Sequence, residues 1–134
     1  MQETEEKKLI LVVDDNEFYR TAATTILIEK YKVVTANSGI EAVELLMQDL
    51  NPDLILLDLV MPGMDGWAAY KRIKEIKPKV PVAFVSSVDG MSEICHSYNL
   101  GIDDFITKPY EMEDLLHRIE IIIENYEDTG EWKF

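Results

Sequence analysis

The sequence has little cysteine, little positive charge and no long hydrophobic run. Cys95 is its one cysteine in 134 residues, which excludes an internal disulfide and favours a reducing compartment. The longest apolar runs cover only a few residues, far fewer than the roughly 20 that a membrane-spanning helix needs. The opening residues, MQETEEKK, carry no hydrophobic signal core, so we expect a cytoplasmic protein rather than a secreted one.

Positive charge is scarce relative to negative charge. The chain has 13 lysine and arginine residues against 26 aspartate and glutamate residues, for a formal net charge of −13. A surface of this sign repels nucleic-acid phosphates and anionic membranes, so we expect neither as a direct partner. The acidic excess mainly favours solubility, and it also suits a basic protein partner.

What the sequence does contain is typical of one globular domain. Hydrophobic residues make up 47% and charged residues 29%, an ordinary balance that argues against disorder. The length is sufficient for a buried core. We expect a polar leader at residues 1–7, a domain at 8–126 and an acidic tail at 127–134.

Strand-like and helix-like segments alternate along the whole chain. Apolar segments with many β-branched residues predict strands at 8–15, 31–36, 53–58, 80–87 and 104–108. Amphipathic stripes predict helices around 19–27, 38–50, 67–73, 91–98 and 115–126. Tyr19 belongs to the stripe of the first helix, Asn51 and Pro52 are expected to stop the second, and Asp65 is expected to cap the third. The buried stripe of the second helix is expected to be Ile40, Val43, Leu46, Met47 and Leu50. Strands that are apolar throughout are covered on both faces, so the fold class is α/β with a parallel sheet between helices.

Polar side chains gather at the predicted carboxyl ends of the strands, where open α/β sheets bind their ligands. The first strand ends in Asp14 and Asp15, the third in Asp58, the fourth in Ser86 and Ser87, and the fifth in Lys108. Converging carboxylates repel one another unless a cation lies among them, and oxygen ligands favour Mg²⁺. A carboxylate can also act as a nucleophile and form an aspartyl phosphate, with a lysine offsetting the phosphoryl charge. These residue types therefore predict phosphoryl transfer onto Asp58.

At this point the sequence resembles the receiver domains of two-component response regulators. The resemblance covers nearly the whole chain and rests on ILVVDDN, LILLDLVMPGMDG, VPVAFVSS and DDFITKPY, in the family's order and spacing. It implies a CheY-like, flavodoxin-like (βα)5 fold, a doubly wound five-stranded parallel sheet with strand order 2-1-3-4-5. One such motif alone would be a weak signal, whereas four together are specific.

The resemblance also implies roles for single residues. Asp58 matches the phospho-acceptor, and Asp14 and Asp15 match the acidic pair that holds Mg²⁺, with Mn²⁺ as a possible substitute. Val60 would offer its backbone carbonyl to the metal. Lys108 matches the lysine that precedes a proline, and the bond between them is usually cis in this family.

The same resemblance implies a switch and a set of partners. Ser86 matches the switch hydroxyl and Phe105 the switch aromatic, which turns inward when Ser86 moves towards the phosphoryl group. The donor would be a histidine kinase or a histidine phosphotransfer protein. The surface of the fourth helix, fifth strand and fifth helix would then change its affinity for an effector that the sequence does not name. We expect a signalling domain that is not an enzyme, as a monomer or weak dimer.

Three positions depart from the family's commonest pattern. Ser87 stands where a small apolar residue is usual. Val60 and Val88 occupy the two variable positions that modulate dephosphorylation, and neither can position an attacking water through a polar side chain. We therefore predict slow intrinsic loss of phosphate.

Several alternatives remain open on the sequence alone. Asp14 and Asp15 could cap the first helix, since strand-to-helix turns favour aspartate. Phe105 could be a core aromatic with no switching role. The register of Ser86 and Ser87 could differ by one residue.

Other functions are also conceivable. A haloacid-dehalogenase-like hydrolase would want a second acid where Val60 stands, and a flavodoxin-like nucleotide-binding module would want a glycine-rich loop after the first strand. The chain could also be the receiver portion of a larger regulator or hybrid kinase.

Overall fold

A computed structural model describes residues 7–59, 66–87 and 105–129 of the chain. These residues form a five-stranded parallel sheet with the strand order β2-β1-β3-β4-β5. Its strands are β1 (Leu9–Val13), β2 (Lys32–Ala36), β3 (Leu54–Asp58), β4 (Val82–Ser87) and β5 (Phe105–Lys108). The predicted class, strand order and five strand positions are therefore confirmed, with bounds within two residues of those expected.

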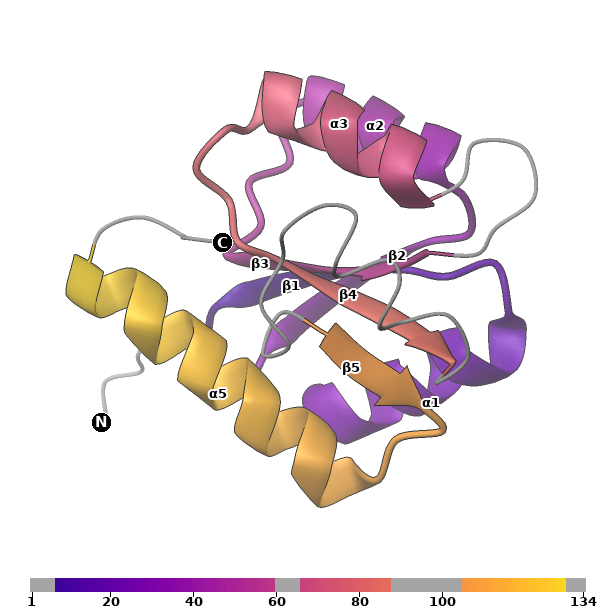
Figure 1. The fold of residues 1–134 in the computed structure, drawn as a ribbon, viewed down its shortest axis with the longest axis vertical. Coiled ribbons are helices and arrows are strands. Elements are labelled where there is room, and N and C mark those ends of the chain that lie inside the picture. The colour runs from indigo at the N-terminus through magenta and orange to yellow at the C-terminus, as the bar shows by residue number, and fades with distance from the viewer. Residues whose placement is uncertain (1–6, 60–65, 88–104, 130–134) are drawn as a thin grey trace, which may run out of the picture.

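Helices cover both faces of this sheet. They are α1 (Glu17–Leu27), α2 (Gly39–Met47), α3 (Gly66–Ile76) and α5 (Met112–Thr129). Figure 1 shows α1 and α5 on one face and α2 and α3 on the other. The helix predicted around 91–98 lies outside the described residues. Among the helices that the structure describes, none is long and apolar enough to cross a membrane.

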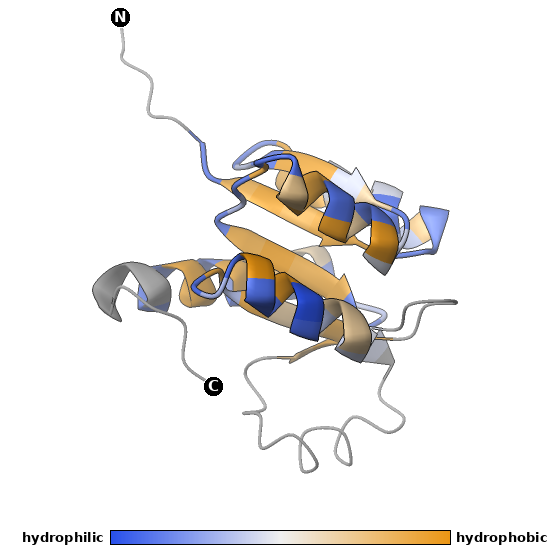
Figure 2. Cartoon of the chain, turned by 90° about the horizontal axis from the view of Figure 1, so that it is seen from above, coloured by the Kyte–Doolittle hydropathy of each residue, from blue (hydrophilic) through white to orange (hydrophobic). Residues whose placement is uncertain are grey.

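Strand alternation builds two apolar layers from the same strands. In β1, Leu11 and Val13 belong to the core beneath α2 and α3, whereas Ile10 and Val12 belong to the core beneath α1 and α5. Successive side chains of a strand point to opposite faces, so a strand between two helical layers must be apolar at every position. Figure 2 shows this as strands that are hydrophobic along their length between helices of mixed character.

The helix α1 begins at an asparagine rather than at one of the aspartates. The side chain of Asn16 accepts a hydrogen bond from the backbone N–H of Tyr19 at 3.1 Å, which satisfies a free donor of the first turn. The alternative that Asp14 or Asp15 caps this helix is therefore wrong.

The helix α2 corrects the predicted buried stripe. Val43 and Leu46 are buried as expected, but Ile40 is 54% exposed and Met47 is 60% exposed. A helix turns by about 100° per residue, and the face that packs on the sheet is centred on Gly39, Ala42, Val43 and Leu46. Ile40 and Met47 lie on its flank. Ranking residues by hydrophobicity overlooked the small residues that let the helix approach the sheet.

The end of α2 also differs from the prediction. The helix stops at Met47, before the expected stop at Asn51 and Pro52. Asp49 then adopts a left-handed φ of 72°, a conformation that aspartate tolerates better than most residues. Leu50 consequently packs against the core from the connection rather than from the helix.

Candidate functional site

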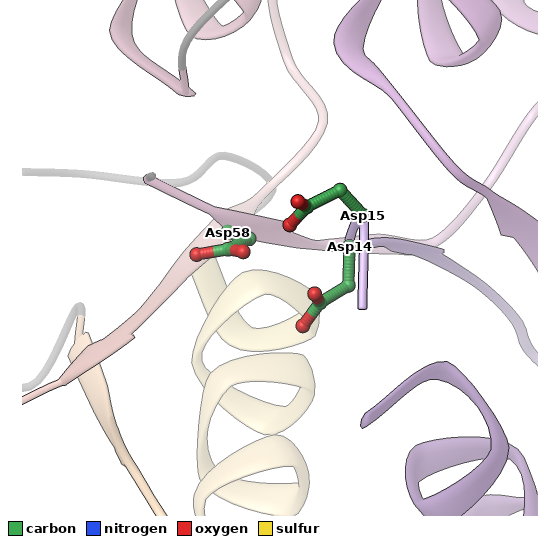
Figure 3. Close-up of side chains that lie close together, drawn as sticks. All are labelled: Asp14, Asp15 and Asp58. Atoms are coloured by element: carbon green, nitrogen blue, oxygen red, sulfur yellow. The ribbon is translucent and has the colours of Figure 1, made fainter. Parts of the chain in front are cut away.

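Three aspartates meet at the carboxyl edge of the sheet. Asp14 and Asp15 directly follow β1, and Asp58 is the last residue of the neighbouring strand β3. Each offers a carboxylate oxygen, and these oxygens lie within 4.8 Å of one another (Figure 3). Asp14 and Asp58 are each 4% exposed, whereas Asp15 is open to solvent. The structure thus brings together the three acids that the sequence singled out.

Lys108 lies against two of these acids. Its Nζ is 2.8 Å from Oδ2 of Asp14 and 3.4 Å from Oδ2 of Asp58, and its side chain is 14% exposed. Burial alone would lower the pKa of Lys108, but the hydrogen bond to Asp14 and the charges of Asp58 and Asp14 outweigh it, so the pKa is raised. Lys108 is therefore an ammonium ion at neutral pH. The Lys108–Pro109 bond is cis, as the family resemblance led us to expect.

Strand alternation explains why these charges meet. Asp14, Asp58 and Lys108 follow by two residues Val12, Leu56 and Ile106, which all belong to the core beneath α1 and α5. Side chains two residues apart share a face, so each strand directs its terminal charge to the same side. Ser86 instead lies on the same face of β4 as Phe84, which belongs to the core beneath α2 and α3.

Ser86 is close to Asp58 in the sheet. Asp58 is the register partner of Val85, so Ser86 lies one residue further along the neighbouring strand. It is 3% exposed and pairs in register with Thr107. Ser86 would therefore approach the end of β3 from the side of the sheet opposite to Lys108.

Hydrogen bonds to its carboxylate and to its backbone carbonyl hold Asp14 in place. Its Oδ1 accepts a hydrogen bond from the N–H of Asn16 at 2.9 Å, and its carbonyl oxygen accepts one from Arg20 at 2.8 Å. Oδ2 of the same carboxylate faces Lys108. A carboxylate restrained in this way is oriented before any ligand arrives.

Two residues of this region were not identified as site residues from the sequence. Tyr19, expected only as a member of the core stripe of α1, places its ring 4.2 Å from Nζ of Lys108. The ring of Tyr110 lies 5.6 Å from that of Tyr19, and the Tyr110 hydroxyl donates to the Tyr19 carbonyl oxygen at 3.4 Å. Burial, followed by the charge of Asp14, raises the pKa of Tyr110. The position of Tyr110 directly after the Lys108–Pro109 pair was the sequence signal that could have indicated its place near the site.

A third residue that the sequence did not identify is Gly66, at the start of α3. A Cβ at this position would lie 2.4 Å from Cα of Leu59 and 2.5 Å from the carbonyl oxygen of Asp58. Its N–H donates to the carbonyl oxygen of Leu59 at 2.9 Å. Only glycine allows α3 to begin this close to the end of β3, a constraint that a turn-rich sequence does not reveal.

Phe105 lies in the core in this structure. It is 1% exposed and stacks on Phe84 with ring centroids 5.3 Å apart. Its carbonyl oxygen accepts a hydrogen bond from Arg118 of α5 at 3.0 Å. The predicted metal ligand Val60, the variable position Val88 and the predicted helix cap Asp65 lie outside the described residues.

The donor set at this edge fits a small, hard divalent cation. Three carboxylate oxygens converge, and Asp15 leaves the cluster open to water, which Mg²⁺ retains in its coordination sphere. The paired carboxylates also leave negative charge that Lys108 alone does not balance. Receiver domains bind Mg²⁺ at an aspartate cluster of this kind.

Comparisons with known proteins agree with this geometry. The sequence profile of the response regulator receiver domain matches residues 10–120. The chemotaxis protein CheY of Halobacterium salinarum is 32% identical over 117 residues, covering 87% of this chain and 97% of that protein. The response regulator MprA of Mycobacterium leprae is 33% identical over 115 residues, covering 85% of this chain.

The matched proteins differ in length. This chain spans 50% of MprA, so it corresponds to about half of that relative. The crystal structure of the receiver domain of NtrX from Brucella abortus superposes with a TM-score of 0.76 at 31% identity, covering 86% of this chain and 98% of that one. The chain therefore belongs to the response regulator receiver domain family, whose members are signalling domains of two-component systems.

Proposed function

We propose that this chain accepts a phosphoryl group on Asp58 from a phosphohistidine of a histidine kinase or histidine phosphotransfer protein. One observation carries the proposal. Asp58 is a nearly buried carboxylate at a strand end, with an ammonium 3.4 Å away and two further carboxylates in the same cluster. Carboxylates gathered at the rim of a core are costly unless opposite charges offset them.

The chemical step is a displacement at phosphorus. A carboxylate oxygen of Asp58 forms the new bond to phosphorus, and the bond between phosphorus and the donor's imidazole nitrogen breaks. The electron pair of that bond remains on the imidazole nitrogen, and the ring leaves as neutral imidazole because its other nitrogen carries a proton taken from water. Lys108 is within reach of Asp58 and offers its positive charge to the phosphoryl oxygens.

We propose that the site holds Mg²⁺, for which Mn²⁺ could substitute. Its ligands would be the carboxylates of Asp14, Asp15 and Asp58 and the backbone carbonyl of Val60. When bound, the ion neutralises negative charge on the phosphoryl oxygens and orients them for in-line transfer. The hydrogen bonds from Asn16 and Arg20 keep Asp14 in a fixed orientation for this purpose. Because Asp14 would also bind the metal, it would attract Lys108 less strongly. The ammonium of Lys108 could then interact with the phosphoryl group on Asp58.

Phosphorylation is proposed to select one of two arrangements of the domain. The hydroxyl of Ser86 would donate to a phosphoryl oxygen, and Phe105 would occupy the space beside β4. In the arrangement described here the Phe105 ring is already inward, stacked on Phe84. The proposal therefore requires an outward arrangement that is populated without phosphate. Partner binding would change at the surface of β5, α5 and the helix that the sequence predicts around 91–98.

The matched pair Asp58→Asn and Asp53→Asn tests the acceptor. Both residues belong to the same segment, but Asp53 lies at its amino end and accepts a hydrogen bond from Leu9. After incubation with Mg²⁺ and acetyl phosphate, intact mass should show one phosphoryl gain in the wild type and in Asp53→Asn, and none in Asp58→Asn. No gain in the wild type under saturating donor, or a gain that survives Asp58→Asn, would overturn the proposal.

Two further measurements separate this function from its alternatives. Because Val60 and Val88 cannot position water, the phosphoryl group should persist for minutes or longer in Mg²⁺ buffer, and a lifetime of seconds would contradict this. A phosphatase built on the same aspartate would turn over phosphate esters many times, whereas the proposed receiver should show almost no turnover.

A further inference from the structure

We propose that Tyr19 is a positioning residue that holds the ammonium of Lys108 beside Asp58, with Tyr110 supporting the Tyr19 ring. The proposal rests on the proposed role of Asp58 and Lys108 in phosphoryl transfer. Its basis is the position of the ring, whose centroid is 4.2 Å from Nζ of Lys108. Aromatic rings attract cations within about 6 Å of their centroid, most strongly where water is partly excluded.

Lys108 needs such a restraint because its side chain is long and has four rotatable bonds. Asp14, at 2.8 Å, holds its Nζ more closely than Asp58 does, at 3.4 Å. A cation bound by the carboxylates would weaken their attraction for the lysine, and the ammonium would then gain freedom to move away. The ring of Tyr19 carries no net charge and does not bind a metal ion. Its attraction for the Lys108 ammonium therefore persists when the carboxylates are occupied by a cation.

The ring of Tyr19 is itself contacted by a second aromatic ring. Tyr110 follows the Lys108–Pro109 pair, and its ring packs against Tyr19 at 5.6 Å with an interplanar angle of 55°. Its hydroxyl donates to the carbonyl oxygen of Tyr19 at 3.4 Å. The segment that carries Lys108 thus also carries the residue that fixes the ring, so α1 and the end of β5 are coupled at the site.

The test uses Tyr19→Leu, which removes the ring, and Tyr19→Phe, which keeps it. Phe18→Leu is the matched control, because Phe18 precedes Tyr19 in α1, is 71% exposed and touches the Tyr19 ring edge-on. Phosphorylation by acetyl phosphate should slow by about three- to tenfold in Tyr19→Leu. Tyr19→Phe and Phe18→Leu should retain the wild-type rate.

A double-mutant cycle with Lys108→Met shows whether Tyr19 acts through the lysine. If it does, adding Tyr19→Leu to Lys108→Met should leave the already reduced rate unchanged. An equal loss in both backgrounds would overturn the proposal, since Tyr19 would then act independently of Lys108. Loss of folding in Tyr19→Leu would shift the test to Tyr110→Leu, whose effect should also vanish in the Lys108→Met background.

A spectroscopic measurement on the metal-free, unphosphorylated protein does not depend on phosphoryl transfer. Protons over the face of an aromatic ring resonate upfield, so the Hε protons of Lys108 should lie upfield in the wild type, in Tyr19→Phe and in Phe18→Leu. They should return to ordinary lysine values in Tyr19→Leu. Ordinary shifts in the wild type would overturn the proposal even if Asp58 is phosphorylated. Upfield shifts in a protein that cannot be phosphorylated would support the contact between Tyr19 and Lys108 and refute the proposed function alone.

Discussion

Two partly buried lysines lie at opposite edges of the sheet, and their pKa values are shifted in opposite directions. Lys108, at the carboxyl edge, meets Asp14 and Asp58, and their charges raise its pKa despite the opposing effect of burial. Lys74 lies near the end of α3, at the amino edge, and donates to the carbonyl oxygens of Pro78 and Val80. Burial lowers the pKa of Lys74 to about 8.

The aspartates of the two edges differ in the same way. At the amino edge, Oδ2 of Asp53 accepts a hydrogen bond from the N–H of Leu9 at 2.8 Å, which joins the starts of two strands. At the carboxyl edge, three carboxylates converge, and two of them, Asp14 and Asp58, contact Lys108. Charges at the amino edge are used to complete backbone hydrogen bonding, whereas those at the carboxyl edge leave an imbalance that a ligand can satisfy.

Gly66→Ala should disrupt the carboxyl edge, and we expect it to have the largest effect on stability. The added Cβ would lie 2.4 Å from Cα of Leu59 and 2.5 Å from the carbonyl oxygen of Asp58, so the backbone must move. We expect a loss of about 2–3 kcal/mol in the free energy of unfolding, together with slower phosphorylation of Asp58. Denaturant unfolding measures the first and intact mass the second.

A matched substitution controls for changes anywhere on α3. Lys71 lies on the exposed side of the same helix, and Lys71→Ala should alter neither quantity appreciably. Wild-type stability in Gly66→Ala would show that the close approach of α3 to the end of β3 is dispensable.

The amino edge is tested by Asp53→Ala. Removing the acceptor of the Leu9 N–H should lower the free energy of unfolding by about 1–2 kcal/mol. Phosphorylation should remain, because the substitution lies at the far end of β3 from Asp58. Thermal unfolding and acetyl phosphate labelling of the same sample check both statements. A variant that loses phosphorylation while keeping its stability would erase the distinction between the two edges.

The pH dependence of stability should separate Lys74 from an ordinary surface lysine. Between about pH 8 and pH 10.5 the unfolded chain keeps the Lys74 proton while the folded protein loses it. Stability therefore rises with pH across this window relative to Lys74→Met. The gain should be about 1 kcal/mol, because partial exposure screens much of the shift.

Denaturant midpoints at several pH values measure this difference. Lys71→Met provides the exposed control on the same helix, and its difference from the wild type should stay flat over the same window. A flat difference for Lys74→Met as well would mean that its hydrogen bonds to the carbonyl oxygens offset burial.

The smallest expected effect on stability comes from Asp15→Asn. Removing one exposed carboxylate from the cluster relieves repulsion, so the metal-free protein should become more stable by about 0.5 kcal/mol. Added Mg²⁺ should raise the melting temperature of the wild type and have little effect on this variant. Glu17→Gln, an exposed acid that begins α1, controls for general charge. Equal stabilisation of all three proteins by Mg²⁺ would place the ion elsewhere.

Much of the fold and of the site could be predicted because both follow from strand alternation. Continuous apolar strands require helices on both faces, and the carboxyl ends of parallel strands collect the terminal charges at one edge. Asp14, Asp58 and Lys108 meet for this reason. The choice of Asn16 as the helix cap removed the main structural alternative for the aspartates.

What could not be predicted depends on approach distances and on small residues. Gly39 and Ala42 set the face of α2, so the exposed Ile40 and Met47 were assigned to the core in error. Gly66 matters because of a contact with backbone atoms, which no hydrophobic pattern encodes. Tyr19 fitted the core stripe of α1, and only the three-dimensional position of Lys108 gives its ring a second role.

The central claim is that Asp58, rather than another acid at this edge, takes the phosphoryl group. Borohydride reduces an acyl phosphate to the corresponding alcohol, so reduction after acetyl phosphate treatment marks the acceptor as homoserine. Peptide mass spectrometry of the digested protein should locate homoserine at position 58 alone, and only when both Mg²⁺ and phosphodonor were present. Homoserine at the positions of Asp14, Asp15 or Asp53 instead, or at none, would contradict the account.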